Sequence, residues 1–234
     1  MKRPRLTDYS STLLLVVLSW CLVAVSQGAQ QTTTASAGED WPAFLGPRQD
    51  GTSLETGLLK SWPPQGPVKV WSRSVGNAYS APVTARGRLL LFHRVKDDEE
   101  LLCLDAKNGK QIWAQKYPTG YEDRYGYNNG PRSSPAIDGN RVYVFGAEGK
   151  LTCLDFETGR LLWQRAANDE YRVPQNFFGA GTAPVVEGSL VLVNVGGPEG
   201  AGVVGFDKLS GKTVWKTSND GASYSSPVVR TIQG

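Results

Sequence analysis

The stretch that decides the fold is DAKNGKQIW at residues 105–113, because the chain repeats its pattern twice more. The second copy is DFETGRLLW at 155–163 and the third is DKLSGKTVW at 207–215. All three fit Asp-x-x-(Asn/Thr/Ser)-Gly-x-x-x-Trp, and they begin 50 and then 52 residues apart. Self-similarity at such a period is typical of solenoids and propellers. Residues that recur in every copy are therefore better explained by structure than by catalysis.

A second phrase runs in step with the first, as SAP at 80–82, SSP at 133–135, TAP at 182–184 and SSP at 225–227. Each phrase begins a short apolar run, and after each of the first three phrases two further apolar runs follow before the Asp-to-Trp segment. Four short strands per repeat, without a helical pattern, indicate a propeller blade. We therefore predict an all-β fold, a β-propeller of four-stranded antiparallel blades. A β-solenoid is the competing architecture, but its rungs are usually shorter.

The repeated residues have local structural explanations. Each repeat Asp can accept hydrogen bonds from backbone N–H groups of its own turn. Each repeat glycine is expected to supply a positive φ angle in that turn; these are Gly109, Gly159 and Gly211. A further tryptophan, Trp71, precedes the first SAP phrase, and we predict a short strand around it at 69–74.

The N-terminal region reads as a targeting segment. Residues 1–26 carry a basic start, a 14-residue apolar stretch at 12–25 and small residues before Gln27, which predicts a cleaved signal peptide. A membrane anchor is the alternative, yet 14 residues are fewer than the roughly 20 that a spanning helix needs. Residues 27–39 are polar and are predicted to be a disordered linker before a propeller domain at 40–234. We thus expect an exported protein, periplasmic or extracellular, with no stable membrane span after cleavage.

Charge and cysteine content exclude several classes of protein. The formal net charge is only +3, and part of it lies in the expected leader, which argues against a nucleic-acid partner. Cys103 and Cys153 occupy the same register of successive repeats, where a disulfide would be too long. Both are expected to be buried thiols. The sequence has no Cys/His cluster for zinc or haem, so no metal site is expected.

Catalytic residues are scarce. His93 is the only histidine and is interpreted as a half-buried strand residue rather than a base, since it lies in the expected second strand of the first blade, RLLLFHRV at 88–95. The acidic run 97–100 is interpreted as a solvated hairpin turn, not as a metal site. We expect no catalytic or cofactor-binding residue in the chain.

Two long links between blades stand out by composition. The link at 117–132 holds four tyrosines, two asparagines and two arginines, and the link at 171–182 adds two phenylalanines. Such mixtures are favoured at recognition surfaces, although the same links could simply close one end of the propeller. The candidate partner-binding residues are Tyr125, Tyr127, Asn128, Asn129, Arg132, Phe177 and Phe178.

The repeated Asp-to-Trp phrase resembles the tryptophan-docking repeat of the pyrroloquinoline-quinone (PQQ) propellers, over about residues 41–234. The resemblance implies that each tryptophan packs against the glycine-containing turn of a neighbouring blade. On this basis the docking residues are Trp71, Trp113, Trp163 and Trp215 with Gly109, Gly159 and Gly211. The opening WPAFLGPRQDG at 41–51 and the phrase GPRSSP look most like the cofactor-free members, which include the lipoprotein subunit of the outer-membrane β-barrel assembly machine.

The resemblance leaves two functions open. One is a non-catalytic binding or scaffolding module of the cell envelope, with an envelope or extracellular protein as its partner and no cofactor. The other is a PQQ- and calcium-dependent quinoprotein oxidoreductase of the alcohol or sugar dehydrogenase type. The sequence lacks the adjacent cysteine pair and a recognisable calcium ligand set of many such enzymes. Because 224–234 reads as the start of another repeat, we expect an incomplete arc of about three full blades plus parts of two.

Overall fold

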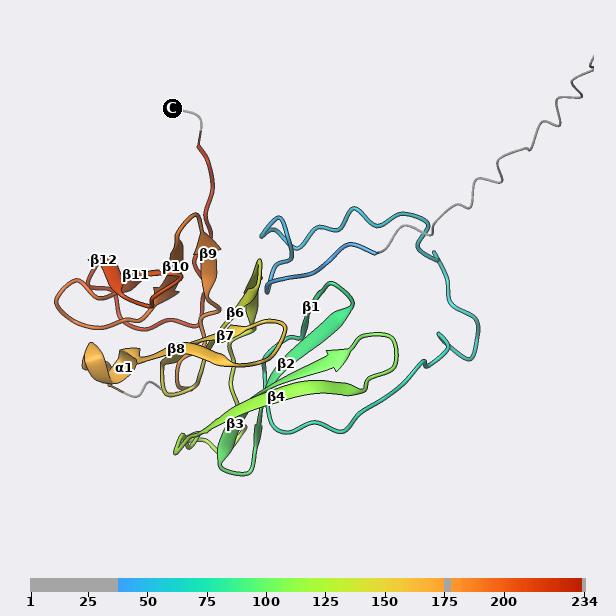
Figure 1. The fold of residues 1–234 in the computed structure, drawn as a ribbon, viewed down its shortest axis with the longest axis horizontal. Helices are drawn as coiled ribbons and strands as arrows, with labels where there is room; N and C mark the ends of the chain where they lie inside the picture. The colour runs from blue at the N-terminus through green and yellow to red at the C-terminus, as the bar shows by residue number, and fades with distance from the viewer. Residues whose placement is uncertain (1–37, 175–177, 233–234) are drawn as a thin grey trace, which may run out of the picture. The chain divides into compact units, whose positions relative to one another are not determined.

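The computed structural model describes residues 38–174 and 178–232 (Figure 1). The predicted signal peptide and nearly all of the predicted linker lie outside these residues, as does Phe177. Residues 38–234 form one compact unit. The described residues hold no helix whose length and apolar character would carry it across a membrane.

The chain folds into antiparallel sheets of four strands, each formed by four consecutive strands. The first sheet contains β1 (Val83–Ala85), β2 (Arg88–Val95), β3 (Asp98–Asp105) and β4 (Gln111–Pro118). The second contains β5 (Ala136–Asp138), β6 (Arg141–Phe145), β7 (Lys150–Asp155) and β8 (Leu161–Ala166). The third contains β9 (Val185–Glu187), β10 (Leu190–Asn194), β11 (Val203–Asp207) and β12 (Thr213–Thr217). A single turn of helix, α1 (Ala167–Glu170), follows β8.

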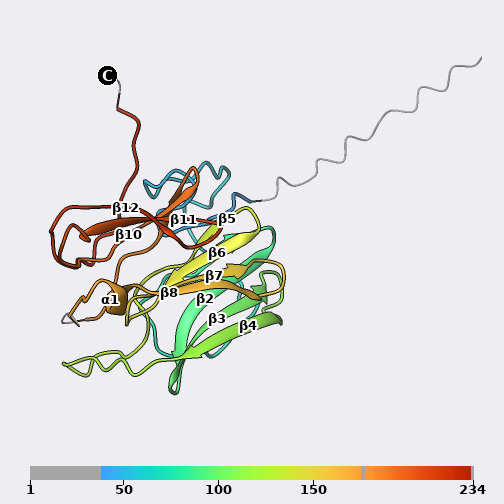
Figure 2. The ribbon, with the colours of Figure 1, turned by 60° about the vertical axis from the view of Figure 1, so that its left-hand side comes forward.

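The sheets are arranged as propeller blades. Their first strands are neighbours, since β5 packs against both β1 and β9, and Figure 2 shows the second sheet between the first and the third. The small residues of the Pro-marked phrases lie at this inner position, where Ser133 and Ser134 are buried. The predicted all-β propeller fold is confirmed, as three four-stranded blades that do not close into a ring.

The hydrophobic core lies between blades. One cluster joins the first and second blades through residues such as Leu90, Phe92, Val142 and Leu154. A second joins the second and third blades through side chains that include Tyr143, Phe145 and Phe206, with Val191 and Val204. Cys103 and Cys153 are buried in these clusters as free thiols. Burial raises the pKa of the Cys103 thiol to about 11, so it stays protonated and packs as a small hydrophobic group.

The same irregularity precedes the tryptophan in every blade. The pairing register shifts between Cys103 and Leu104, between Cys153 and Leu154, and between Gly205 and Phe206. A bulge of this kind bends the strand and redirects the side chain beside it. Its recurrence opposite the tryptophan indicates that it helps to aim the indole at the next blade.

Two expectations about strands and turns were wrong. Residues 69–74 form no strand, because their backbone pairs with no other strand in the described part of the chain. The acidic run 97–100 is not a solvated turn either. Only Asp97 lies in the turn, while strand alternation in β3 places Glu99 on the face that packs against the second blade, where it is 1% exposed.

Candidate functional site

The repeated tryptophans connect successive repeats. A Cβ placed on Gly109 would lie 2.7 Å from the Trp71 ring, and the corresponding distances are 2.6 Å for Gly159 and Trp113 and 2.7 Å for Gly211 and Trp163. All three glycines have φ angles near +70°. Only glycine combines this backbone conformation with so close an aromatic ring.

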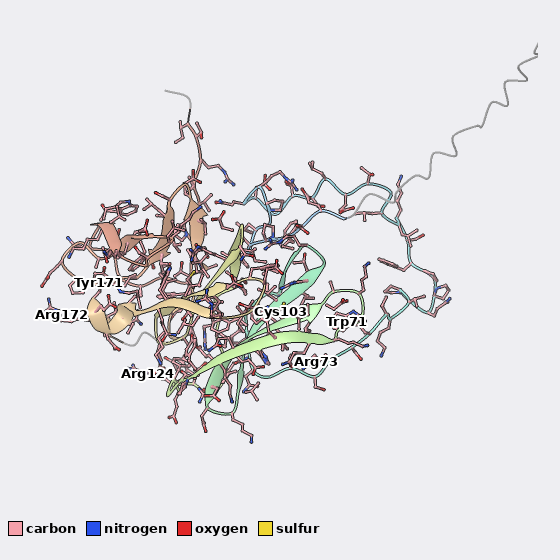
Figure 3. All side chains as sticks on the ribbon, in the orientation of Figure 1. Trp71, Arg73, Cys103, Arg124, Tyr171 and Arg172 are labelled. Atoms are coloured by element: carbon pink, nitrogen blue, oxygen red, sulfur yellow. The ribbon has the colours of Figure 1, made fainter. Side chains whose placement is uncertain are left out.

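Each docked indole also donates one hydrogen bond to the turn that it covers. The Nε1 groups of Trp71, Trp113 and Trp163 donate to the carbonyls of Ala106, Phe156 and Lys208, at 3.0, 3.1 and 3.2 Å. Arg73 adds a bond to Gln111, so the segment around Trp71 lies along the start of β4 (Figure 3). Trp215 is half-buried against Gly205 of its own blade. Trp71, Trp113 and Trp163 thus hold successive repeats together.

The link between β4 and β5 is organised by a buried ion pair. An Arg132 guanidinium nitrogen lies 2.7 Å from Asp123 Oδ2, and the Asp123 side chain is fully buried. Arg132 also donates to the carbonyls of Gly130 and Asn128, at 2.9 and 3.0 Å. Asp123 accepts from the backbone N–H of Tyr125 at 2.9 Å. Both members of the ion pair therefore also bond to the backbone of the link and stabilise its conformation.

The two asparagines of the same link are also used internally. Asn129 Oδ1 accepts from the N–H of Asp123 at 2.9 Å, and Asn128 Oδ1 accepts from the N–H of Gly130 at 2.8 Å. Asn128 Nδ2 donates to the carbonyl of Ala78 at 3.3 Å, which fastens the link to the segment before β1. Of the candidate residues, Asn128, Asn129 and Arg132 thus support the loop.

The aromatic candidates are exposed and gather in one place. Tyr125 is 56% exposed and Tyr127 is 71% exposed. Their rings are stacked with centroids 6.1 Å apart, and the Phe178 ring lies 5.8 Å from Tyr125 and 6.4 Å from Tyr127. Phe178 belongs to the other long link, between β8 and β9. The two links that composition singled out therefore meet.

Two further tyrosines, which composition did not single out, complete the group. Tyr224 lies 5.6 Å from Phe178 between ring centroids, and its hydroxyl accepts from the N–H of Phe178 at 3.0 Å. Tyr79 precedes β1 and donates its N–H to the carbonyl of Pro131 at 2.9 Å. We call these five residues, Tyr79, Tyr125, Tyr127, Phe178 and Tyr224, the aromatic surface.

A hollow of about 370 Å³ opens in the aromatic surface. Its walls are Tyr79, Asp123, Tyr127, Arg132, Phe178, Gly181 and Tyr224. The Arg132 guanidinium carbon lies 5.4 Å from the Tyr79 ring centroid and 5.8 Å from that of Phe178. The same carbon also lies 5.1 Å from the ring centroid of the buried Tyr121. The Arg132 guanidinium, held by Asp123, thus packs against several of the aromatic rings by cation–π contacts.

The buried titratable groups have structural partners. His93 is 3% exposed, its Nδ1 accepts from the N–H of Gly76 at 2.8 Å, and its Nε2 lies 3.2 Å from Glu100. Burial lowers the pKa of His93 despite the opposing effect of Glu100. Glu99 accepts from the Tyr117 hydroxyl at 2.6 Å and from the N–H of Ala147 at 2.8 Å. Burial raises the pKa of Glu99. His93, Glu99 and Glu100 are not among the residues that line the aromatic hollow.

The described residues include no group of three His, Cys, Asp or Glu side chains that could hold a metal ion.

Tandem four-stranded blades joined by docked tryptophans define a PQQ-like β-propeller repeat protein. The family described as "Outer membrane protein assembly factor BamB" matches residues 97–234, and the chain belongs to this family. The assembly factor BamB of Burkholderia pseudomallei (strain K96243) is 26% identical over 67% of this chain and 39% of its own length.

Quinoprotein dehydrogenases are relatives as well. Quinohemoprotein alcohol dehydrogenase ADH IIB of Pseudomonas putida is 22% identical over 92% of this chain and 31% of its own length. Among solved structures, the quinohemoprotein alcohol dehydrogenase of Comamonas testosteroni matches 75% of the chain with a TM-score of 0.51 and 21% identity, which supports the fold. The chain spans less than two fifths of the length of either curated relative.

Proposed function

We propose that this protein is an exported, non-catalytic PQQ-like propeller that binds a partner protein in the periplasm or at the cell envelope. The observation that carries the proposal is the aromatic surface, in which exposed rings from two inter-blade links and two further segments converge on one hollow. Tyrosine-rich surfaces over a rigid base are typical of recognition sites, since the rings offer contact area at low entropic cost.

Two further observations support the proposed export and the proposed non-catalytic role. The N-terminal 26 residues have the pattern of a signal peptide, and one relative is named an outer membrane protein assembly factor. In the described residues the buried His93 and Glu99 are bonded to backbone and tyrosine groups and do not line the hollow. No cofactor is part of this proposal.

The test uses the full-length protein, tagged and recovered from the envelope fraction with its bound partners. Tyr127→Ala combined with Tyr224→Ala is expected to release a partner that the wild type and a Trp62→Ala control both retain. Trp62 is a suitable control because it is 61% exposed but does not belong to the aromatic surface. Equal retention by all three proteins would contradict the proposal.

The second candidate function is a PQQ-dependent oxidoreductase, favoured by the similarity to alcohol dehydrogenase ADH IIB along 92% of the chain. It is tested on the same full-length protein after incubation with PQQ and calcium. We expect no quinone-dependent oxidation of alcohols or sugars. Robust turnover would contradict the binding function and support the dehydrogenase function.

A further inference from the structure

The aromatic hollow is electrically balanced. Among the residues that line it, the charged ones are Asp123 and Arg132, and these neutralise each other at 2.7 Å. Both side chains are buried, with 8% of Arg132 and none of Asp123 exposed. A charged ligand would therefore lose its hydration without gaining an unpaired counter-charge. Charge complementarity favours an uncharged occupant.

The walls of the hollow offer mainly aromatic surface, which favours compact apolar groups. Tyr127, Phe178 and Tyr224 follow one another with centroid separations of 6.4 and 5.6 Å. The exposed fractions of Tyr79, Tyr127 and Tyr224 are 58%, 71% and 44%, so each side chain offers apolar area to a ligand. The volume of about 370 Å³ lies at the lower end of the range for ligand pockets, enough for a few side chains rather than a folded element.

The hollow is held open by its own scaffold. A Cβ on Gly181 would lie 2.8 Å from Tyr224 Cδ1, so this glycine allows the Tyr224 ring to stand at the wall. The Phe178 N–H bond to the Tyr224 hydroxyl joins the segments that carry these two rings, and the Asn128 bond to Ala78 joins the segments that carry Tyr127 and Tyr79. The rings are thus pre-organised, which lowers the entropic cost of binding.

From these features we infer that the aromatic hollow binds an uncharged, proline-rich, extended segment of the partner protein. This inference rests on the proposed function and names the partner's chemistry. Proline-rich segments adopt the polyproline II conformation before binding, present compact apolar rings at a regular spacing, and dock on aromatic-lined grooves.

The experiment titrates the full-length protein with a short capped peptide of Pro-Pro-Ala triplets and follows binding by calorimetry. We expect saturable binding that is nearly independent of salt concentration, because no net charge is engaged. A peptide of equal length with alanine in place of proline is expected to bind at least about tenfold more weakly. Tyr127→Ala and Tyr224→Ala are each expected to weaken binding of the proline peptide by about tenfold.

Gly181→Ala provides a variant that removes no aromatic ring. Since it displaces the Tyr224 ring, it is expected to weaken binding while the denaturation midpoint changes little, and Trp62→Ala is expected to bind as the wild type does. Absence of proline-peptide binding, or preferential binding of an oligosaccharide or a charged peptide, would overturn the inference. If the proline peptide does not bind but the double variant Tyr127→Ala with Tyr224→Ala still loses the partner, the proposed function stands and only this inference fails. If the double variant retains the partner, the proposed function and the inference are both contradicted.

Discussion

At the scale of single residues, the fold depends on contacts between one glycine and one indole. Gly159 has a φ angle of +72° and meets the Trp113 ring, whose Nε1 donates to the neighbouring carbonyl of Phe156. Two independent requirements, a left-handed backbone and no side chain, thus fall on the same position. These requirements can be separated by substitution.

Gly159→Ala is expected to destabilise the protein by more than Gly87→Ala. Gly87 shares the φ angle of +72°, but a Cβ there would meet nothing within 4 Å. The control therefore costs about 1–2 kcal/mol for the backbone conformation alone. At Gly159 the clash with the ring adds about 1–3 kcal/mol. Equal losses in denaturant melts would show that the indole contact contributes nothing.

His93 gives a prediction about pH. The groups facing its ring are the N–H of Gly76, which needs an unprotonated Nδ1, the Glu100 carboxylate, and the more distant Arg73. Burial keeps the pKa of His93 in the folded protein below its usual value of about 6.5. The unfolded chain therefore takes up the proton first, and stability falls as the pH drops below about 6.5.

The measurement is direct because His93 is the only histidine. Its imidazole resonance is expected to titrate at a lower pH in the folded protein than in urea. His93→Gln, which does not titrate, is expected to lose less stability than the wild type between neutral and mildly acidic pH. A folded pKa above the unfolded one would refute this interpretation.

At the scale of elements, strands and turns were predictable where the information is local. The Asp turns recur in three copies, and Asp155 indeed accepts from the N–H of Thr158 at 2.9 Å. The absence of a strand at 69–74 could not be predicted from the sequence, since a strand also needs a neighbouring strand to pair with. Glu99 was misassigned because a run of acids suggests solvent, whereas alternation along β3 turns every second side chain toward the next blade.

Glu99→Ala is expected to destabilise the protein by about 1–3 kcal/mol, because it leaves the Tyr117 hydroxyl and the Ala147 N–H buried without an acceptor. Glu99→Gln retains an acceptor oxygen and is expected to cost less. Asp97→Ala serves as the control, since the Asp97 side chain is 96% exposed. Thermal or denaturant melts rank the three variants, and a harmless Glu99→Ala would contradict the buried assignment.

At the scale of the whole molecule, stability comes from contacts between blades. Trp113 is 8% exposed in its dock, whereas Trp62 is 61% exposed on the segment before the first blade. We expect Trp113→Ala to cost about 3–5 kcal/mol and Trp62→Ala less than about 0.5 kcal/mol. Trp215→Ala is expected to fall between them, because Trp215 contacts only its own blade's Gly205 among the described glycines. Similar losses for Trp113 and Trp62 would contradict the docking arrangement.

The binding surface illustrates what the sequence could not provide. Composition singled out Tyr125, Tyr127 and Phe178, but it could not separate them from Arg132, whose pairing with Asp123 depends on the folded loop. Tyr79 and Tyr224 were missed because they lie 145 residues apart and come together only when the blades assemble around β1, β5 and β9. Local repeats predicted the fold, whereas the site depends on tertiary contacts between links.

The central claim is that the aromatic surface contacts a partner protein, and photocrosslinking from position 127 tests it most directly. The full-length protein would carry a photoreactive phenylalanine analogue in place of Tyr127, and in a matched control in place of Trp62. Irradiation of cells is expected to yield one discrete adduct from position 127, suppressed by Gly181→Ala, and none from position 62. No adduct from position 127, or the same adducts from both positions, would contradict the account.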